Sequence, residues 1–389
     1  MKVTFFSNFL NHHQLPFCLA MDRLTKGNFT FVATTPVPAE RLNLGYHDMN
    51  KQYPFVLTTY DSPENAMAAY ALALKSDVVI IGSAPEMYVK ERIRQRKLTF
   101  RYSERIYKQG LWKVFSPRRL KTMLLNHTRY WNRPVYMLCA SAYTPFDYGL
   151  TASYLNKTYK WGYFPEVKLQ DLDALFDQKR KNTKVSIAWA GRLIDWKHPD
   201  DAIKTAERLK KKGYDFDLNI IGNGAMEAQL RTMISDKKLE DCVHMLGAMS
   251  PEMVRKNMEA ADIFLFTSDF NEGWGAVLNE SMNSACAVVA SHAIGAVPFL
   301  LKDGETGYVY RNGVMDSLYE CVVRLIEQPE LRERMGRAAY QSLAEVWNAD
   351  VAAERFIELA RLLLSGSMKI PYNEGPCSKA KVLHNGWYK

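Results

Sequence analysis

Two glutamates, Glu272 and Glu280, lie on either side of a glycine-containing turn within residues 261–282, ADIFLFTSDFNEGWGAVLNESM. The apolar run at the start of this stretch is typical of a buried parallel strand. From Gly275 onward the apolar residues follow helical spacing, so we expect a strand, a turn and the beginning of a helix. Ligands of open α/β sheets bind where such strands end. The stretch therefore predicts a ligand site with two carboxylates beside it.

The predicted turn has the features of an anion site. Backbone N–H groups at the start of a helix have no partners within it, and the helix dipole places positive charge there. Glycine lets the backbone come close to an anion because it has no Cβ. The turn therefore suits a diphosphate, while one glutamate could accept hydrogen bonds from sugar hydroxyls and the other from a ribose. The simpler alternative is two surface glutamates beside an ordinary turn.

A second polar segment follows another predicted strand, Lys184–Ala190. Here the chain continues as GRLIDWK over residues 191–197. Arg192 and Lys197 could hold a diphosphate from two sides, because arginine offers a planar fork of donors and lysine a point charge. Taken alone, this pair has little predictive value.

Together the two segments resemble the E-x7-E and G-R-L-x-x-x-K motifs of the retaining family 4 (group 1) glycosyltransferases, with Lys197 at the matching spacing. The resemblance covers residues 184–364 well and the N-terminal half only in outline. It implies the α/β fold class called GT-B, in which two Rossmann-like, doubly wound domains face a central cleft and a C-terminal helix crosses back to the first domain. It also implies retention of configuration by front-face attack, in which the departing phosphate oxygen takes the acceptor proton.

The resemblance also implies roles for individual residues. Glu272 is expected to contact the transferred sugar, Glu280 the ribose, and Arg192 and Lys197 the leaving phosphate. Preorganised donors of this kind typically supply ~3–4 kcal/mol each. The other residues expected to bind the donor are Gly191, Gly222, Asn223, Leu246, Gly247, Gly273, Trp274, Gly275, Ala276 and Val277.

The N-terminal half departs from the family pattern in two places. Its first loop has Asn11, His12 and His13 where many members have a Gly-Gly pair. We expect these residues to meet a hydroxyl of the acceptor or donor; the alternative is that they only cap the following helix. Where the family commonly has a histidine that touches the transferred sugar, this sequence reads YSER over residues 102–105. Glu104 is the candidate substitute in catalysis.

Composition narrows the classes of protein that fit. The chain has 389 residues, 47% of them hydrophobic and 24% charged, as expected for two domains with substantial cores. Its six cysteines are scattered without metal-ligand spacing, which indicates a reduced chain without structural zinc. The D-x-D sequences at 171–173 and 215–217 are interpreted as unrelated to metal binding. We expect no metal and no other cofactor, since the nucleotide sugar is a substrate.

Positive charge is concentrated in residues 90–133, which contain fourteen Lys and Arg against two Glu, although the net charge of the chain is only +9. Within this segment, residues 110–131 interleave aromatic and aliphatic residues with basic ones. The pattern suits an anionic membrane surface; the alternative is a solvated basic helix whose apolar side belongs to the core. No nucleic-acid partner is expected, because no recognition motif accompanies the charge. With no signal peptide and no stretch of the ~20 apolar residues that a span needs, we expect a cytoplasmic protein, peripheral at the inner membrane face.

We expect an acceptor-binding Rossmann-like domain over residues 1–167, a linker over 168–183, a Rossmann-like domain that binds the nucleotide sugar over 184–345, and a crossover helix and tail over 346–389 that pack on the first domain. The predicted reaction transfers a hexose-type sugar from a nucleotide-diphosphate sugar, with UDP favoured and GDP next. Its acceptor is a glycan or lipid-linked molecule in the biosynthesis of polysaccharides or cell-surface glycans. Two alternatives stay open: a nucleotide-sugar epimerase using Glu104 or His13, and a non-catalytic nucleotide-binding relative.

Overall fold

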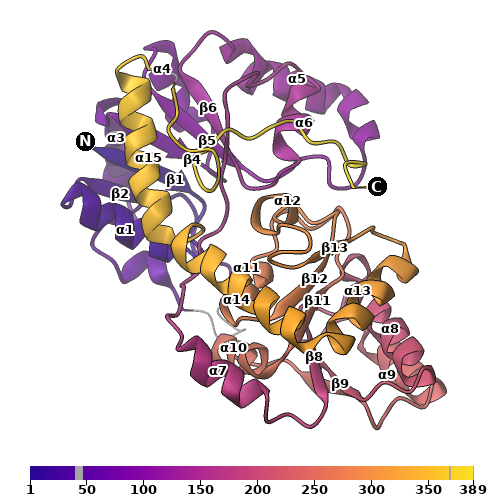
Figure 1. Cartoon of the computed structure of the whole chain (residues 1–389). Coiled ribbons are helices and arrows are strands. Elements are labelled where there is room, and N and C mark those ends of the chain that lie inside the picture. Colours follow the sequence, from indigo (N-terminus) through magenta and orange to yellow (C-terminus); the bar gives the residue numbers. More distant parts are fainter. Residues whose placement is uncertain (40–46, 368, 389) are drawn as a thin grey trace. The chain divides into compact units, whose positions relative to one another are not determined.

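The computed structural model describes residues 1–39, 47–367 and 369–388, which divide into two compact units (Figure 1). The first unit comprises residues 1–166 and 347–384, and the second comprises residues 167–346 with the segment that starts at 385. Each unit contains a parallel sheet, of seven strands in the first and six in the second. The expected α/β class with two doubly wound domains is confirmed.

The first unit has the strand order β3-β2-β1-β4-β5-β6-β7. Three of its strands, β1, β4 and β6, are buried along their whole length, as expected for a parallel sheet covered by helices on both faces. The strands are β1 (Val3–Ser7), β2 (Phe29–Ala33), β3 (Val56–Thr58), β4 (Val78–Ile81), β5 (Thr99–Ser103), β6 (Val135–Cys139) and β7 (Thr158–Lys160). The helices are α1 (Leu15–Thr25), α3 (Pro63–Lys75), α4 (Met87–Arg94), α5 (Pro117–Asn126), α6 (Thr144–Gly149) and α15 (Ala349–Leu364), with short 3-10 helices η1 (Met49–Lys51), η2 (Leu111–Phe115) and η3 (Thr128–Tyr130).

The second unit has the strand order β10-β9-β8-β11-β12-β13, so the direction of winding reverses between β8 and β11. Ligands of doubly wound sheets bind at such a switch point, beside the carboxyl ends of the strands. The strands are β8 (Val185–Ala190), β9 (Phe216–Ile221), β10 (Val243–Gly247), β11 (Ile263–Phe266), β12 (Ala287–Ser291) and β13 (Tyr308–Tyr310). The helices are α7 (Leu172–Lys179), η4 (Asp195–Lys197), α8 (Pro199–Lys211), α9 (Glu227–Asp236), α10 (Pro251–Ala260), α11 (Val277–Asn283), α12 (Val297–Leu300), α13 (Met315–Glu327) and α14 (Pro329–Glu345).

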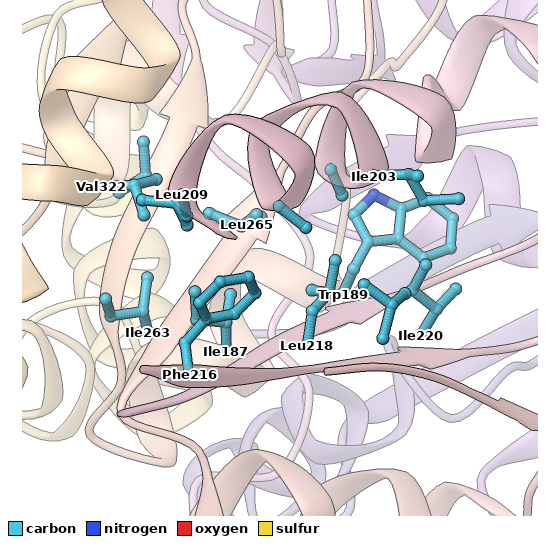
Figure 2. Close-up of a cluster of buried hydrophobic side chains, with 14 of the residues drawn as sticks. Ile187, Trp189, Ile203, Leu209, Phe216, Leu218, Ile220, Ile263, Leu265 and Val322 are labelled. Atoms are coloured by element: carbon cyan, nitrogen blue, oxygen red, sulfur yellow. The ribbon is translucent and has the colours of Figure 1, made fainter. Parts of the chain in front are cut away.

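The core of the second unit lies between its sheet and the helices α8 and α13 (Figure 2). Ile203 and Leu209 of α8 are fully buried against the sheet, and Val322 joins them from α13. Trp189 of β8 is packed in the same cluster, and its indole nitrogen donates to the hydroxyl of Thr267 at 2.8 Å. This bond connects β8 with the segment that follows β11, which keeps the ends of these two adjacent strands together.

The C-terminal helix α15 belongs to the first unit. It begins where the side chain of Asn348 accepts a hydrogen bond from the backbone N–H of Val351, which caps the helix. Phe356 of α15 makes an edge-to-face contact with Phe17 of α1, with ring centroids 6.3 Å apart. The chain thus leaves the first unit near residue 166 and returns to it through α15.

Two boundaries differ from the domain division expected from the sequence. Residues 168–183, expected as a linker, contain α7 and belong to the second unit. The ammonium group of Lys179 donates to the backbone carbonyl of Ala261 at 2.6 Å, which fixes α7 to that unit. In the C-terminal tail, residues 377–380 pair with β7 of the first unit. The Tyr388 hydroxyl, however, donates to a carbonyl of β13 in the second unit. Polar composition predicts neither arrangement, because both depend on individual long-range contacts.

Candidate functional site

The lysine and glutamate of the two sequence motifs form an ion pair in the second unit. Lys197 Nζ lies 2.6 Å from Glu272 Oε2, and only 13% and 12% of the two side chains are exposed. The hydroxyl of Ser268 contacts the same carboxylate oxygen at 3.1 Å. Lys197 follows β8 and Glu272 follows β11, so the pairing of these two strands brings the motifs together.

A second cation, Arg192, lies on the same loop after β8. It is exposed, and its guanidinium carbon is 6.0 Å from the ring centroid of Trp196. Lys197 Nζ lies 4.9 Å from the same ring. The two cations are therefore positioned by one indole, and Arg192 is accessible to an anionic ligand.

The loops after β8 and β9 approach each other too closely for a side chain at Gly222. A Cβ at Gly222 would lie 1.9 Å from the carbonyl oxygen of Gly191, and the φ of Gly222 is +134°. Gly222 N–H donates to the carbonyl of Gly247, and the carbonyl of Asn223 accepts from Leu193. Four of the predicted donor-binding residues therefore form one cluster at the carboxyl ends of adjacent strands. Leu246 is 37% exposed at the end of β10 in the same region.

The turn between β11 and α11 is held by Trp274, whose side chain is fully buried. Its indole nitrogen donates to the side chain of Asn279 at 2.9 Å. Trp274 thus supports the turn from inside the unit, and its predicted contact with the donor stays a prediction. The backbone N–H groups of Gly275, Ala276 and Val277 donate to no acceptor in the described part of the chain. They follow the buried Gly273 in the turn predicted to bind an anion.

Glu280 lies in the first turn of α11 and is half-buried. Burial raises the pKa of its carboxyl group, and the positive charge of Arg255 partly opposes that increase. One of the Arg255 guanidinium nitrogens donates to the backbone carbonyl of Glu280 at 3.1 Å. The ribose contact expected of Glu280 stays a prediction.

In the first unit, Asn11 takes part in the start of α1. Its side-chain oxygen accepts from the backbone N–H groups of His13 at 3.1 Å and Gln14 at 3.2 Å. The ring of His13 stacks on Tyr163 with centroids 5.8 Å apart and planes 4° from parallel, and the ring of His12 lies 3.7 Å from that of His13. These contacts show that the loop has a structural role. The ligand contact expected of Asn11, His12 and His13 stays a prediction.

Glu104 lines a pocket of about 480 Å³ in the first unit, at the carboxyl ends of β1, β4 and β5. One oxygen of its carboxylate accepts from the Tyr163 hydroxyl at 2.6 Å, and the other is paired with Lys108 Nζ at 2.5 Å. Asn11 lines the same pocket, and so does His127, which the sequence did not single out. His127 comes from the end of α5, inside the segment interpreted as a membrane-binding helix, and nothing local to its sequence indicates a pocket.

The segment of residues 110–131 forms η2, α5 and η3 in the first unit. Of its large apolar side chains, Met123 and Tyr130 are buried, whereas Trp112, Phe115 and Trp131 are 67%, 82% and 71% exposed. The alternative in which the apolar side of this helix belongs to the core is therefore wrong for most of the segment. Among the described residues, no helix has the length and apolar character needed to cross a membrane.

Residues 172–342, which make up most of the second unit, match the family described as glycosyl transferases group 1. This unit, with its paired motifs at the switch point of the sheet, is therefore similar to the domain that this family shares. The match covers less than half of the chain.

Curated glycosyltransferases are similar in sequence to this chain over part of their length. The chain is 31% identical over 221 residues to the amylovoran biosynthesis glycosyltransferase AmsK of Erwinia amylovora, covering 55% of this chain and 52% of that protein. It is 29% identical over 175 residues to the alpha-D-kanosaminyltransferase of Streptomyces kanamyceticus, covering 45% of each. The matches thus span about half the length of these relatives.

Solved structures share the fold over nearly the whole chain. Anabaena Alr3699/HepE, in complex with UDP, has a TM-score of 0.67 at 16% identity and covers 94% of this chain and 100% of its own. A glycosyltransferase from Rickettsia africae has a TM-score of 0.64 at 14% identity, covering 94% and 99%. Together with the two doubly wound units, these similarities confirm the GT-B fold.

Proposed function

We propose that this protein is a retaining, metal-independent glycosyltransferase that moves a hexose-type sugar from a nucleotide-diphosphate sugar to a glycan or lipid-linked acceptor. The observation that carries the proposal is the ion pair of Lys197 and Glu272 at the carboxyl ends of β8 and β11. It joins a cation suited to a diphosphate with a carboxylate suited to sugar hydroxyls, next to the switch point of the sheet.

The geometry of the pair supports a division of labour. Lysine has three N–H donors, so Lys197 can hold Glu272 and a phosphate oxygen at the same time. Lys197 and Ser268 both contact Oε2 of Glu272, which leaves Oε1 to accept from hydroxyls of the transferred sugar. Arg192 and the N–H groups of the turn would stabilise the charge that develops on the leaving phosphate.

The proposed chemical step needs no protein nucleophile. The bond between the anomeric carbon and the phosphate oxygen breaks while the acceptor oxygen bonds to the same face of that carbon. The departing phosphate oxygen takes the proton of the acceptor hydroxyl. Glu280 is proposed to hold the ribose, and Glu104, in the first unit, to assist on the acceptor side.

The donor nucleotide is proposed to be UDP, with GDP as the second candidate. A relative from Corynebacterium glutamicum is named as GDP-mannose-dependent, and the Erwinia relative is named for amylovoran biosynthesis. A role in the biosynthesis of polysaccharides or cell-surface glycans is consistent with these names.

We also propose that the protein is cytoplasmic and binds an anionic membrane surface through residues 90–133. Three exposed aromatic side chains, those of Trp112, Phe115 and Trp131, lie on this segment beside its basic residues. No acidic residue occurs between Glu104 and Asp147. Apolar side chains that can enter the interface, together with basic charge, are what binding to anionic lipids requires.

NMR of the full chain with a panel of UDP- and GDP-hexoses, in the presence of EDTA, tests the proposed reaction. Slow hydrolysis of one donor is expected, and the sugar first released should have the anomeric configuration of that donor. Release of the inverted anomer would contradict retention, and activity only after metal is restored would contradict metal independence.

A further inference from the structure

The pocket of the first unit is built from side chains of several elements. It has a volume of about 480 Å³, which lies within the range of about 300–1,000 Å³ found for small-molecule sites. Glu104 follows β5, His127 follows α5, and Tyr163 lies beyond β7. Because elements distant in sequence converge on it, the pocket depends on the fold of the whole unit.

Every lysine and arginine that lines this pocket is already paired with a carboxylate. Arg101 forms two hydrogen bonds with Glu86, at 2.5 and 2.7 Å. Arg105 lies 3.3 Å from Asp147, with both side chains fully buried. The third cation, Lys108, is paired with Glu104 at 2.5 Å. The positive charges are therefore compensated, and the pocket does not present a free cation to an anionic ligand.

Besides these paired cations, the pocket offers a ligand a paired carboxylate and a neutral imidazole. Glu104 uses one acceptor position on each oxygen, for Tyr163 and Lys108, and a carboxylate has about four in total. His127 Nδ1 is bonded to the Tyr154 hydroxyl at 2.7 Å, and in the described ranges no partner is recorded for its Nε2. Burial and the charge of Arg101 lower the pKa of His127 to about 3, so the imidazole is neutral.

We propose that this pocket binds an uncharged polyhydroxylated group, such as a neutral sugar ring, with Glu104 and His127 as its hydrogen-bonding residues. Hydroxyl groups donate to a carboxylate and exchange hydrogen bonds with a neutral imidazole, whereas a phosphate would meet the negative charge of Glu104 without an unpaired cation to offset it. The inference rests on the proposed function in one respect. If the protein transfers a sugar as proposed, the group bound in this pocket is the acceptor, and its chemical class is an uncharged sugar.

Ligand-observed saturation-transfer NMR of the full chain tests this. The probes are methyl α-D-glucopyranoside, methyl α-D-mannopyranoside and glucose 6-phosphate. Saturation should pass from the wild-type protein to at least one of the two neutral glycosides, which shows binding, and not to glucose 6-phosphate. In Glu104→Gln, binding of the glycoside should weaken roughly tenfold or more, because a hydrogen bond to a charged group is lost. The same change leaves Lys108 unpaired, so the preference should move toward glucose 6-phosphate.

Two further variants make the outcome decisive. Glu91→Gln is the matched control, since Glu91 is a half-exposed carboxylate paired with Arg94 outside the pocket; its probe binding should equal wild type. Tyr163→Phe keeps the ring and removes the donor to Glu104, and should weaken glycoside binding even if Glu104→Gln folds poorly. Saturation of no neutral glycoside, equal saturation of phosphate and glycosides, or unchanged binding in both pocket variants would overturn the proposal. UDP and GDP binding, measured on the same samples, reports separately on the proposed function.

Discussion

Lys197 and Glu272 are 75 residues apart in the sequence, yet Nζ and Oε2 of the two side chains are 2.6 Å apart. The loops that carry them follow two adjacent parallel strands, β8 and β11, whose pairing fixes this distance. The ion pair therefore depends on the register of the sheet. A cation and a carboxylate held in this way can act on the two halves of a nucleotide sugar.

Glu272→Ala should reduce sugar transfer by at least about 100-fold, because a preorganised hydrogen-bonding group at the reacting sugar is lost. Nucleotide binding should be largely retained, since Lys197 and Arg192 remain. Steady-state transfer rates and nucleotide titrations measure the two effects. Glu272→Gln, which keeps the shape of the side chain, is the matched comparison. Equal loss of transfer and of nucleotide binding would contradict the assigned role.

Lys197→Met should weaken UDP binding by about 10- to 100-fold, because a charge-assisted contact with the diphosphate is removed. Binding of uridine, which has no phosphate, should change much less. Lys211→Met is the control, since Lys211 is an exposed lysine paired with Glu207 on the same unit. Calorimetric titration with UDP and with uridine measures binding to the wild type, to Lys197→Met and to Lys211→Met. A similar loss for uridine and UDP would show that Lys197 does not contact the diphosphate.

Gly222→Ala should destabilise the second unit by about 2–4 kcal/mol, because its Cβ would overlap the carbonyl oxygen of Gly191 in a left-handed backbone conformation. Gly213→Ala is the matched control: its φ is +81°, and no heavy atom lies within 4 Å of the added Cβ. It should cost only about 1 kcal/mol. Urea unfolding gives both values. Equal costs would contradict the close approach of the two loops.

His127 should make the first unit less stable in acid. Its pKa is lowered to about 3 in the folded protein from an ordinary value of 6.5, so the unfolded chain binds more protons between these values. The part of the free energy of unfolding that depends on a neutral His127 is fully present above pH 6.5. It decreases as the pH falls toward 3, by up to about 1.4 kcal/mol per pH unit. His127→Gln should remove this part of the slope in urea unfolding at pH 4–7. The exposed His47→Gln should not; an unchanged slope in His127→Gln would contradict the burial of a neutral imidazole.

The triple variant Trp112→Ser, Phe115→Ser and Trp131→Ser should abolish flotation with vesicles that contain anionic phosphatidylglycerol. The wild type should bind these vesicles and not neutral phosphatidylcholine ones, with less binding at high salt. Leu169→Ser is the control, since Leu169 is 87% exposed on the second unit. Wild-type protein that stays unbound to anionic vesicles would contradict the membrane proposal.

The candidate donor site could be predicted from the sequence because its residues lie in two short segments that follow strands. Glu272 and Lys197 come directly after apolar runs, and parallel strands bring their carboxyl ends to one edge. The role of Trp274 could not be predicted, because only the fold shows that its ring is buried under the turn. His127 could not be predicted either: its place in the pocket depends on the packing of α5 near β5 and on long-range contacts such as the bond to Tyr154.

The helix α7 shows a different limit of sequence-based prediction. The polar residues around it are typical of a linker, but Lys179 is buried and donates to three backbone carbonyls of the second unit. Burial of a lysine is unfavourable unless such partners exist, and the sequence gives no sign of acceptors that lie more than 80 residues away.

The most direct test of the central claim is a thermal-denaturation panel with UDP, GDP, ADP and CMP in EDTA, on wild type and Lys197→Met. A nucleotide at a hundred times its dissociation constant should stabilise the domain that binds it by about 2.7 kcal/mol. We predict that UDP, or failing that GDP, raises the melting temperature of the wild type and that Lys197→Met reduces the increase. No increase with any nucleotide, or an equal increase in both proteins, would contradict a diphosphate site at the ion pair of Lys197 and Glu272.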